Sequence, residues 1–365
     1  MSIIESVEAI PLGIPLKKPL RWGAAGRIER LEHVAVRIRT QGGVVGFGEA
    51  APRPMIYGES LASVMHALTQ WFAPTVTGLD CTAPEKIVAA MDTVAGNPSA
   101  KSAIEMAVYD AAARCAGIPL RRYLGGWSDE VPVSYMLSLG KPQDVVREAV
   151  GIKSDTGINA FKIKAGLSVA ADIELVRTLR GELGADAILY PDFNEQYTLH
   201  EALRAIGEMA QYDIAWVEEP IPVGNHEQRR QLAARLPVPI LADDSATTLA
   251  SAGRQLAEGI AGVLCIKLAR TGIRQSQRIL ACGAAFGVRS IVGSQGLTDL
   301  GTSHSAQFAA AYRDVVAPAD LGNFIKQSEY VLDDLPVLKD GKIILSDAPG
   351  SGVELDDARL KRLAI

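Results

Sequence analysis

Hydrophobic and polar positions follow two different patterns along this chain. Near the start, residues 3–12, 32–40 and 44–50 are predicted strands, with alternation in HVAVRIRT and a turn at QGG. Residues 59–117 instead place apolar residues at helical spacing, and the last stretch ends at Gly117 before Pro119, a helix-stop signal. Three strands followed by helices predict an α+β unit over residues 1–125.

The middle of the chain alternates short apolar strands with amphipathic helices. The predicted strands are residues 132–138, 159–164, 187–192, 214–218, 239–242, 262–267, 288–292 and 315–318. This alternation fits either a closed (β/α)-barrel or a doubly wound sheet. About eight units, without a glycine-rich phosphate turn after the first strand, favour a barrel over residues 126–325. The tail, residues 326–365, contains short strand-like pieces and is expected to return to the first unit.

Charged residues close five of these apolar runs. They are Lys162 and Lys164 in FKIK, Asp192 in LYPDF, Glu218 in WVEEP, Asp243 in ILADD and Lys267 in LCIKL. From Lys164 onward the steps are 28, 26, 25 and 24 residues, about one strand and one helix each. A charge at the end of an apolar run is costly to bury unless it is paired or bound to a metal. The strand tips are therefore expected to converge on one polar site.

The lysines are candidates for acid/base chemistry. Lys162 and Lys164 are two residues apart, so both point to one face of their strand while Phe161 and Ile163 point to the other. Two adjacent ammonium groups and burial are both expected to lower a lysine pKa, which would make one of them a base near neutral pH. Lys267 would lie opposite Lys164. The alternatives are a solvated Lys-x-Lys pair, and a Lys267 that caps a helix or pairs with the second aspartate of ILADD.

Asp192, Glu218 and Asp243 are the candidate metal ligands. Three carboxylates, one per strand, suit Mg²⁺, which keeps its other positions for water and substrate oxygens. No His or Cys accompanies them, so zinc fits less well. Glu219 and Asp244 compete for the same assignment, and the strand pattern places the first of each pair nearer the interior. Asn194 shares the facing of Asp192 and is expected to hydrogen-bond the substrate or a ligand, on the same alternation argument.

In this order, FKIK, PDFN, VEEP, ADDS and CIKLARTG resemble the enolase superfamily, and specifically its muconate lactonizing enzyme subgroup. The resemblance covers nearly the whole chain and implies a modified (β/α)₇β TIM-like barrel with an α+β capping domain. It implies Lys164 and Lys267 as the acid/base pair, Lys162 as a residue that tunes the first, and Mg²⁺, with Mn²⁺ as a substitute, on the three carboxylates. Superfamily sites of this kind combine a Lys or His base with Mg²⁺.

The same resemblance assigns substrate specificity to two capping loops, residues 16–30 and 51–60. Trp22 in the first loop, with Met55 and Tyr57 in the second, would form an apolar, partly aromatic lid. Arg21 and Arg53 are candidates to pair with a second substrate carboxylate, against a simple solvated role for each. An apolar lid with arginines suits a small dicarboxylate such as a muconate.

The reaction is left open between several members of the subgroup. Dipeptide epimerases carry Asp-x-Asp after the eighth strand, whereas this chain has Asp320-Leu321-Gly322. The seventh strand reads SIVGSQG, without the histidine of the mandelate racemase subgroup, and we assign its Ser294 to the substrate pocket and His304 to a structural role. Asp320 either contacts the substrate or caps a helix. A muconate cycloisomerase-like enzyme is favoured over an epimerase of N-acyl amino acids or dipeptides, and over an o-succinylbenzoate synthase-like dehydratase.

Bulk properties narrow the partners. A net charge of −5 and a pI near 5.7 give no basic footprint for nucleic acid. The sequence contains no run of eighteen apolar residues, so we expect no membrane span. The N-terminus has no basic segment followed by an apolar one, so we expect no signal peptide. Four scattered cysteines are expected to be reduced, as in a cytoplasmic protein. The expected partner is a small carboxylate substrate, and the resemblance implies a homo-oligomer, a dimer or an octamer.

Overall fold

The computed structural model describes residues 1–23 and 26–365, and its N-terminal part is a three-stranded antiparallel sheet. The strands are β1 (Ile4–Trp22), β2 (Gly26–Thr40) and β3 (Val45–Ala50), in the order β1-β2-β3. The pairing of β1 with β2 continues to Trp22 and Gly26, so most of the segment expected as a loop, residues 16–30, is the end of a β-hairpin. Leu20 pairs with Ile28 there, and this apolar pair extends the hairpin beyond its predicted ends. Residues 24–25 of that segment lie outside the described residues.

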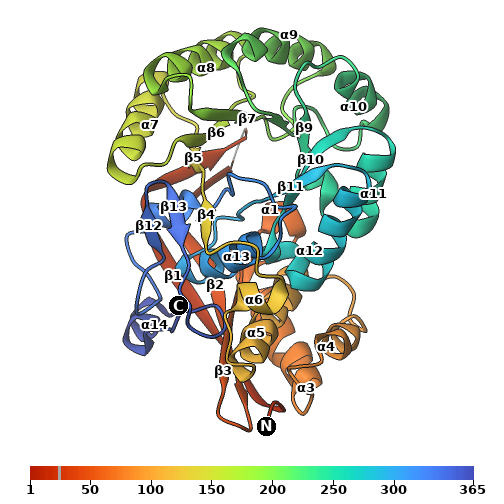
Figure 1. Ribbon diagram of the computed structural model, residues 1–365, viewed down its shortest axis with the longest axis vertical. Coiled ribbons are helices and arrows are strands. Elements are labelled where there is room, and N and C mark those ends of the chain that lie inside the picture. The colour runs from red at the N-terminus through yellow and green to blue at the C-terminus, as the bar shows by residue number, and fades with distance from the viewer. Residues whose placement is uncertain (24–25) are drawn as a thin grey trace.

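Helices cover one face of this sheet (Figure 1). The helices of this region are α1 (Pro54–Tyr57), α2 (Leu61–His66), the π-helix η1 (Ala67–Phe72), α3 (Ala73–Val76), α4 (Pro84–Met91), α5 (Pro98–Cys115) and α6 (Leu120–Leu124), and of these α2, η1, α3 and α5 contact the strands of the sheet. Helix α5 lies directly against β3, because the strand has glycine at the contact. A Cβ at Gly46 would lie 2.2 Å from the carbonyl oxygen of Ala107, and one at Gly48 would lie 2.1 Å from that of Ala103. Glycine is therefore required for this approach.

The middle of the chain forms a parallel sheet of seven strands in sequential order, β11-β10-β9-β8-β7-β6-β5. Its strands are β5 (Tyr135–Leu137), β6 (Ala160–Lys164), β7 (Ile188–Asp192), β8 (Val217–Glu218), β9 (Ile240–Ala242), β10 (Ala261–Ile266) and β11 (Arg289–Val292). The helices outside it are α7 (Pro142–Thr156), α8 (Val169–Leu183), α9 (Leu199–Met209), α10 (His226–Ala233), α11 (Leu249–Ala257) and α12 (Leu268–Ala285), with the 3₁₀ helices η2 (Ala210–Tyr212) and η3 (Asp244–Ala246). They form an arc around the strands in Figure 1. The alternating pattern of the sequence predicted these elements.

The predicted eighth strand, residues 315–318, is not a regular strand, yet its segment contacts both edges of the sheet. Val315 forms a parallel bridge with Ser290 of β11, and Ala319 forms one with Val133 next to β5. Further on, the N–H of Asp320 donates to the carbonyl of Val292 at 2.8 Å. The segment reads VVAPAD, and a proline has no N–H to donate, which interrupts regular pairing.

Side chains alternate between the two faces of the sheet, as the sequence predicts. Phe161 and Ile163 of β6 belong to the outer core cluster, with Val176 and Leu179 of α8. A second cluster is formed by Tyr190, Trp216, Leu241, Val263, Cys265 and Ile291. The intervening positions of β6 are Lys162 and Lys164, both buried.

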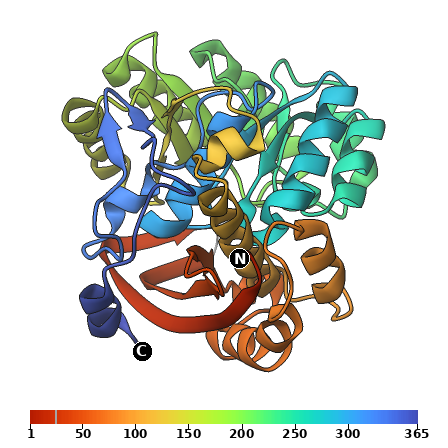
Figure 2. The ribbon, with the colours of Figure 1, turned by 60° about the horizontal axis from the view of Figure 1, so that its bottom comes forward.

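The C-terminal part returns to the N-terminal sheet (Figure 2). Its elements are α13 (Asp299–Ala311), the 3₁₀ helix η4 (Gly322–Lys326), β12 (Val337–Lys339), β13 (Lys342–Ile344) and α14 (Asp357–Leu363). Ala364 bridges Leu12 of β1, and Leu360 and Leu363 of α14 share a core cluster with Leu12. Strands β12 and β13 instead form a small sheet with β4 (Glu130–Pro132). Within the described residues, no helix has the length and apolar character that crossing a membrane requires.

Candidate active site

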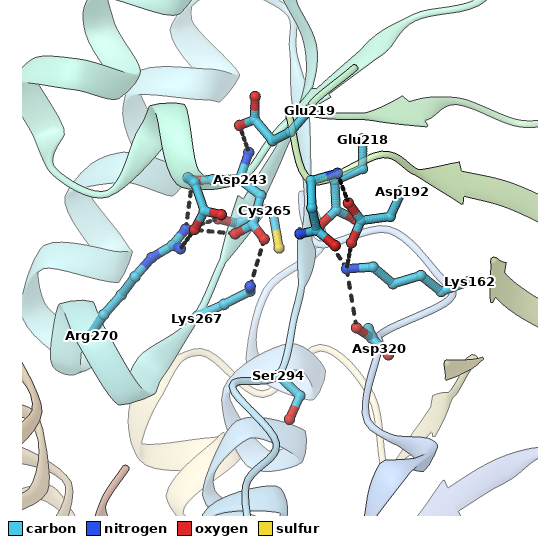
Figure 3. A network of polar contacts seen from close by, with 12 residues as sticks. Lys162, Asp192, Glu218, Glu219, Asp243, Cys265, Lys267, Arg270, Ser294 and Asp320 are labelled. Atoms are coloured by element: carbon cyan, nitrogen blue, oxygen red, sulfur yellow. Dashed lines mark hydrogen bonds and ion pairs between the residues drawn. The ribbon is translucent and has the colours of Figure 1, made fainter. Parts of the chain in front are cut away.

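The charged residues that close the strands meet at one end of the parallel sheet (Figure 3). Lys162 Nζ lies 2.6 Å from Glu218 Oε1, 3.0 Å from Asp192 Oδ2 and 3.6 Å from Asp320 Oδ2. Lys164 Nζ donates to Asp192 Oδ2 at 2.6 Å and to Asn194 Oδ1 at 2.8 Å. Parallel pairing explains this proximity, because Lys164 is in register with Asp192, and Asp192 with Glu218.

On the other side of this group, Lys267 Nζ donates to Asp243 Oδ2 at 2.5 Å. Lys267 follows β10 and is the residue before α12, and Asp243 follows β9. The partner of Lys267 is therefore the first aspartate of ILADD, and not Asp244, which was the alternative considered from the sequence. Lys164 ends β6 and Lys267 follows β10, and the strands that the three carboxylates end or follow, β7, β8 and β9, lie between these two in the sheet.

The structure separates each carboxylate from its neighbour in sequence. Glu218 and Asp243 turn toward the lysines, whereas Glu219 turns away and accepts hydrogen bonds from the N–H of Asp243 at 2.7 Å and from the N–H and hydroxyl of Ser245 at 2.9 and 2.7 Å. Its other oxygen accepts from Arg229 Nη1 at 2.7 Å. These four hydrogen bonds fix Glu219 against the backbone that follows β9.

Arg270 completes the surroundings of Asp243. It lies on the first turn of α12, and its Nη2 is 2.9 Å from Asp243 Oδ1 and donates to the carbonyl of Asp243 at 2.8 Å. Its Nη1 lies 3.5 Å from Asp244 Oδ1. The sequence reading missed Arg270 and the buried Arg229. The signal for Arg270 was its place three residues after Lys267, at the start of the helix that follows β10.

Charge pairing decides the protonation of the site. Burial alone would lower the pKa of Lys162, but Asp192 and Glu218 raise it well above its ordinary value. The pKa of Lys267 is raised in the same way, because Asp243 outweighs burial. The expectation that adjacent ammonium groups lower a lysine pKa is thus wrong for Lys162 in this arrangement. Carboxylates surround it more closely than the second lysine does.

The carboxylates themselves respond in opposite directions. Burial would raise the pKa of Asp192 and of Asp243, but the adjacent lysines hold both well below the ordinary range, with Arg270 contributing at Asp243. Burial and the charge of Asp192 together raise the pKa of Glu218 well above its ordinary value. Strongly perturbed groups gathered in one cavity are typical of a functional site.

The donor set fits a hard divalent cation. All three candidate ligands offer carboxylate oxygens, which Mg²⁺ prefers. Glu218 Oε2 is buried without a hydrogen-bond partner, so it has an oxygen to offer, whereas Asp243 Oδ1 lies 2.9 Å from Arg270 Nη2. As they stand, no three acidic, histidine or cysteine side chains in the described part of the chain already form a metal-binding cluster. The lysines occupy the other carboxylate oxygens instead.

The candidate substrate residues divide between two spaces that share part of their lining. An inner cavity is lined by Trp22, Asn194, Ser294 and Asp320, together with the three lysines. A larger chamber of about 1240 Å³ lies against it, shares Trp22 and Asn194, and is also lined by Tyr57. The hydroxyl of Tyr57 is buried without a hydrogen-bond partner. The structure gives the positions of these side chains, and their roles toward a substrate stay predictions.

Three of these side chains already have local partners. Ser294 Oγ accepts from the N–H groups of Gly296 and Leu297 at 3.0 and 3.1 Å. Asp320 Oδ1 accepts from Asn323 Nδ2 at 3.1 Å. Asn194 adopts a positive φ of 44°, and its N–H donates to Asp192 Oδ1 at 3.0 Å. The same side chains that line the cavity therefore also fix its loops.

The two arginines considered from the sequence have different positions. Arg21 is exposed and lines neither space. Arg53 is partly buried and lines both. His304 is buried in α13, where its Nδ1 lies 3.1 Å from the carbonyl of Leu300.

Comparison with known proteins shows the family. The model for the mandelate racemase / muconate lactonizing enzyme N-terminal domain matches residues 7–125, and that for the enolase C-terminal domain-like family matches residues 144–359. A crystal structure of muconate lactonizing enzyme from Mycobacterium smegmatis, complexed with muconolactone, is 36% identical with a TM-score of 0.96 and covers 100% of both chains.

Epimerases are also among the similar proteins. L-Ala-D/L-Glu epimerase of Bacillus subtilis is 33% identical over 86% of this chain and 87% of its own. A dipeptide epimerase structure from Enterococcus faecalis, complexed with Mg and L-Leu-L-Tyr, is 29% identical with a TM-score of 0.92, covering 96% of this chain and 99% of that one. The chain therefore belongs to the mandelate racemase/muconate lactonizing enzyme family, in the muconate lactonizing enzyme subgroup of the enolase superfamily, and is an isomerase.

Proposed function

We propose that this isomerase is a Mg²⁺-dependent cycloisomerase of the muconate type. Asp192, Glu218 and Asp243 would hold the ion, with Mn²⁺ as a substitute. When bound, Mg²⁺ would stabilise the negative charge that develops on a substrate carboxylate during reaction. The buried, unpartnered oxygen of Glu218 supports this assignment. The relative solved with Mg and a dipeptide supports it from a different chain.

In this proposal the lysines move the proton. Lys164 and Lys267 reach the site from β6 and from the end of β10, so each would approach the α-carbon of the substrate from its own side. In the cycloisomerase reaction, an oxygen of one substrate carboxylate forms a bond to an alkene carbon and so closes the lactone ring. One lysine then delivers a proton to the α-carbon. Lys162 would hold the charge balance between Asp192 and Glu218, both of which it contacts. Asn194 would orient Lys164, whose Nζ donates a hydrogen bond to Asn194 Oδ1.

One observation favours this reaction over dipeptide epimerisation. In the Asp-x-Asp pattern, the second acid would stand at Gly322. A Cβ at Gly322 would lie 2.6 Å from the carbonyl oxygen of Ser134, to which the N–H of Gly322 also donates at 2.9 Å. The backbone packing therefore leaves no room for that acid, and Asp320 is already engaged with Lys162 and Asn323. The second acid of the Asp-x-Asp pattern is therefore missing from this position, which weighs against a dipeptide substrate whose ammonium group depends on it.

An epimerase of N-acyl amino acids remains the second candidate, because two lysines on different strands are what exchange of a proton between two faces of one carbon requires. An N-acyl group carries no ammonium, so the packing at Gly322 does not weigh against this substrate. The dehydratase alternative would use only one of the lysines. Each of these reactions acts on a small carboxylate.

The remaining proposals concern the architecture. We assign residues 1–125 and 326–365 to one capping domain, and residues 126–325 to a (β/α)₇β-barrel in which the segment after α13 takes the eighth place. Contacts between α14 and β1, and the bridges of residues 315 and 319 to the two sheet edges, support this division. A homo-oligomer, dimeric or octameric, is proposed from the resemblance alone.

Proton NMR in D₂O with Mg²⁺ tests the reaction directly. The panel contains muconate isomers, N-acyl amino acids and dipeptides. A new lactone from a muconate supports the cycloisomerase. Deuterium at the α-carbon of an N-acyl amino acid, with no change of skeleton, would support the epimerase instead. A panel in which no muconate isomer forms a lactone would contradict the proposal.

A further inference from the structure

The positively charged side chains at the site differ in whether they have a carboxylate partner, and the proposed reaction does not use this difference. Lys162, Lys164, Lys267 and Arg270 each lie within ion-pairing distance of at least one carboxylate. Arg53 lines the same cavity, yet no ion pair joins it to any acidic side chain in the described part of the chain. A guanidinium that is partly removed from water without a carboxylate partner carries an uncompensated charge.

Neutral groups hold Arg53 in place. Its Nη1 donates to the carbonyl of Pro52 at 2.7 Å and lies 3.1 Å from His33 Nε2, and its Nη2 donates to the carbonyl of Gln295. These contacts fix the plane of the guanidinium without placing a carboxylate directly against it, although the charge of Glu49 acts on it through His33. Burial accordingly lowers the pKa of Arg53 to about 10, where it stays protonated at neutral pH. A guanidinium presents five N–H donors, so donors remain for a ligand.

His33 is itself oriented by Glu49. His33 Nδ1 contacts Glu49 Oε1, and both side chains are fully buried. If Nδ1 donates its proton to Glu49, then Nε2 carries the lone pair that accepts from Arg53. The pKa of His33 agrees with a neutral ring, since burial lowers it. A doubly protonated ring would instead point an N–H at the guanidinium.

Glu49 is not free to neutralise Arg53. Besides His33, it accepts from the N–H of Thr298 at 3.0 Å, from the hydroxyl of Thr298 at 2.6 Å and from the N–H of Gly301 at 2.6 Å. Thr298 and Gly301 lie at the start of α13. The carboxylate therefore ties β2 and β3 to a helix of the other part of the fold, and the histidine lies between it and the arginine.

We propose that Arg53 binds a second carboxylate of the substrate, and that His33, held by Glu49, is the residue that positions it. The substrate class is then a dicarboxylate, with one carboxylate among the lysines and acidic residues of the strand ends and the other on Arg53. A guanidinium pairs well with a carboxylate because two of its N–H groups match the two oxygens. The inference rests on the proposed function only in placing the first carboxylate.

Binding of unreactive acids tests the inference without turnover. The probes are adipate, a saturated six-carbon dicarboxylate, and hexanoate, which has the same length and one carboxylate. Titration calorimetry with Mg²⁺ present compares the wild-type chain with Arg53→Met, Arg53→Lys and the exposed-site control Arg21→Met. We expect wild-type protein and Arg21→Met to bind adipate about tenfold or more tightly than hexanoate, the size of one charge-assisted contact. Arg53→Met should lose this preference, and Arg53→Lys should keep part of it.

A second variant tests the positioning role. Asparagine places an amide N–H near the position of His33 Nδ1, so His33→Asn keeps a donor to Glu49 and removes the acceptor for Arg53. We expect it to weaken adipate binding while hexanoate binding changes less than about twofold, since only the dicarboxylate uses Arg53. Thermal unfolding of each variant identifies any that fails to fold, in which case Arg53→Lys decides the matter.

The outcomes separate this inference from the proposed reaction. Equal affinities of the two acids in wild-type protein, no binding of either, or an unchanged preference in Arg53→Met would overturn the role of Arg53. Adipate binding that depends on Arg53 in a protein that forms no lactone would support the dicarboxylate site and contradict the cycloisomerase. Lactone formation with the same KM in wild-type and Arg53→Met protein would do the reverse.

Discussion

Glu219 Oε1 accepts a hydrogen bond from the backbone N–H of Asp243 at 2.7 Å, so the residue beside one candidate ligand fixes the backbone of another. The two residues directly follow the neighbouring parallel strands β8 and β9, and Glu219 has a positive φ of 38°. This turn of the backbone sends the side chains of Glu218 and Glu219 to different environments. One faces the lysines, and the other faces Ser245 and Arg229.

Glu219→Gln should therefore destabilise the protein and disturb the site together. The amide can accept through only one atom, and its NH₂ group would meet a donor, either Arg229 or the N–H groups of Asp243 and Ser245. Removing one partner of a buried ion pair lowers the free energy of unfolding by roughly 3–5 kcal/mol. We expect a loss of unfolding free energy near the lower end of this range in urea titrations. Glu174→Gln, at an exposed pair with Arg177, is the control and should change little. A Glu219→Gln variant with the unfolding free energy of the wild-type protein would show that these hydrogen bonds of Glu219 are not needed for stability.

Much of the site could be predicted from the sequence because strand periodicity is simple. Alternation in FKIK placed Lys162 and Lys164 on the inner face, and register then brought Asp192 and Glu218 beside them. The choice between Glu218 and Glu219 also followed from facing. What alternation cannot give is the charge balance. We expected burial and a second ammonium group to lower the pKa of one of the two lysines, whereas the carboxylates beside Lys162 raise its pKa.

Contacts between distant segments were beyond such reasoning. His33 has no motif around it, and its neighbours Glu49 and Arg53 come together only when β2, β3 and α1 assemble. The hairpin formed by β1 and β2 was shortened in the prediction, because the resemblance assigned residues 16–30 to a capping loop. The eighth strand position was predicted, but its irregular pairing around Pro318 depends on both edges of the sheet at once.

Glu105 on α5 should make stability depend on pH. Its carboxyl group accepts from the N–H of Arg274 beside Gly272, and burial raises its pKa to about 8 from an ordinary 4.5. The folded state then holds this proton more tightly than the unfolded chain. The stabilising contribution is complete below about pH 4.5 and is lost as the pH rises through 8, at no more than about 1.4 kcal/mol per pH unit.

Glu105→Gln mimics the protonated group and should remove this dependence. Urea titrations at pH 5, 7 and 9 would compare it with wild-type protein. We expect similar unfolding free energies at pH 5, and a relative gain for the variant at pH 9. A difference that stays constant with pH would mean that Glu105 does not titrate in this window.

Gly322→Ala tests whether packing excludes a side chain at the position of the second acid. Its Cβ would lie 2.6 Å from the carbonyl oxygen of Ser134 and 3.3 Å from Ile158 Cδ1. Overpacking of this kind costs roughly 1–3 kcal/mol. We expect that loss in urea titrations, whereas Gly151→Ala, at an open helical position, should be neutral or stabilising. A stable Gly322→Ala would reopen the dipeptide alternative.

Mg²⁺ should stabilise the folded chain through the three carboxylates. An ion that binds only the folded state adds about 2.7 kcal/mol at one hundred times its dissociation constant. We expect a rise in the unfolding temperature of wild-type protein with Mg²⁺, and none in Asp192→Asn, Glu218→Gln or Asp243→Asn. Glu208→Gln, at an exposed pair with Arg204, should respond like wild type. An undiminished response in any of the three variants would remove that residue from the ligand set.

The two lysines should differ in importance if the enzyme is a cycloisomerase. Delivery of one proton needs one acid, so one of Lys164→Ala and Lys267→Ala should lose about 10²–10⁴-fold in kcat, and the other much less. In D₂O the wild-type lactone should carry deuterium in a single stereochemical position. An epimerase predicts a different pattern, in which both variants lose epimerisation, while each still exchanges the α-hydrogen of one enantiomer with the lysine it retains. The deuterium pattern of the two variants therefore distinguishes one-sided from two-sided proton transfer, whichever carboxylate is the substrate.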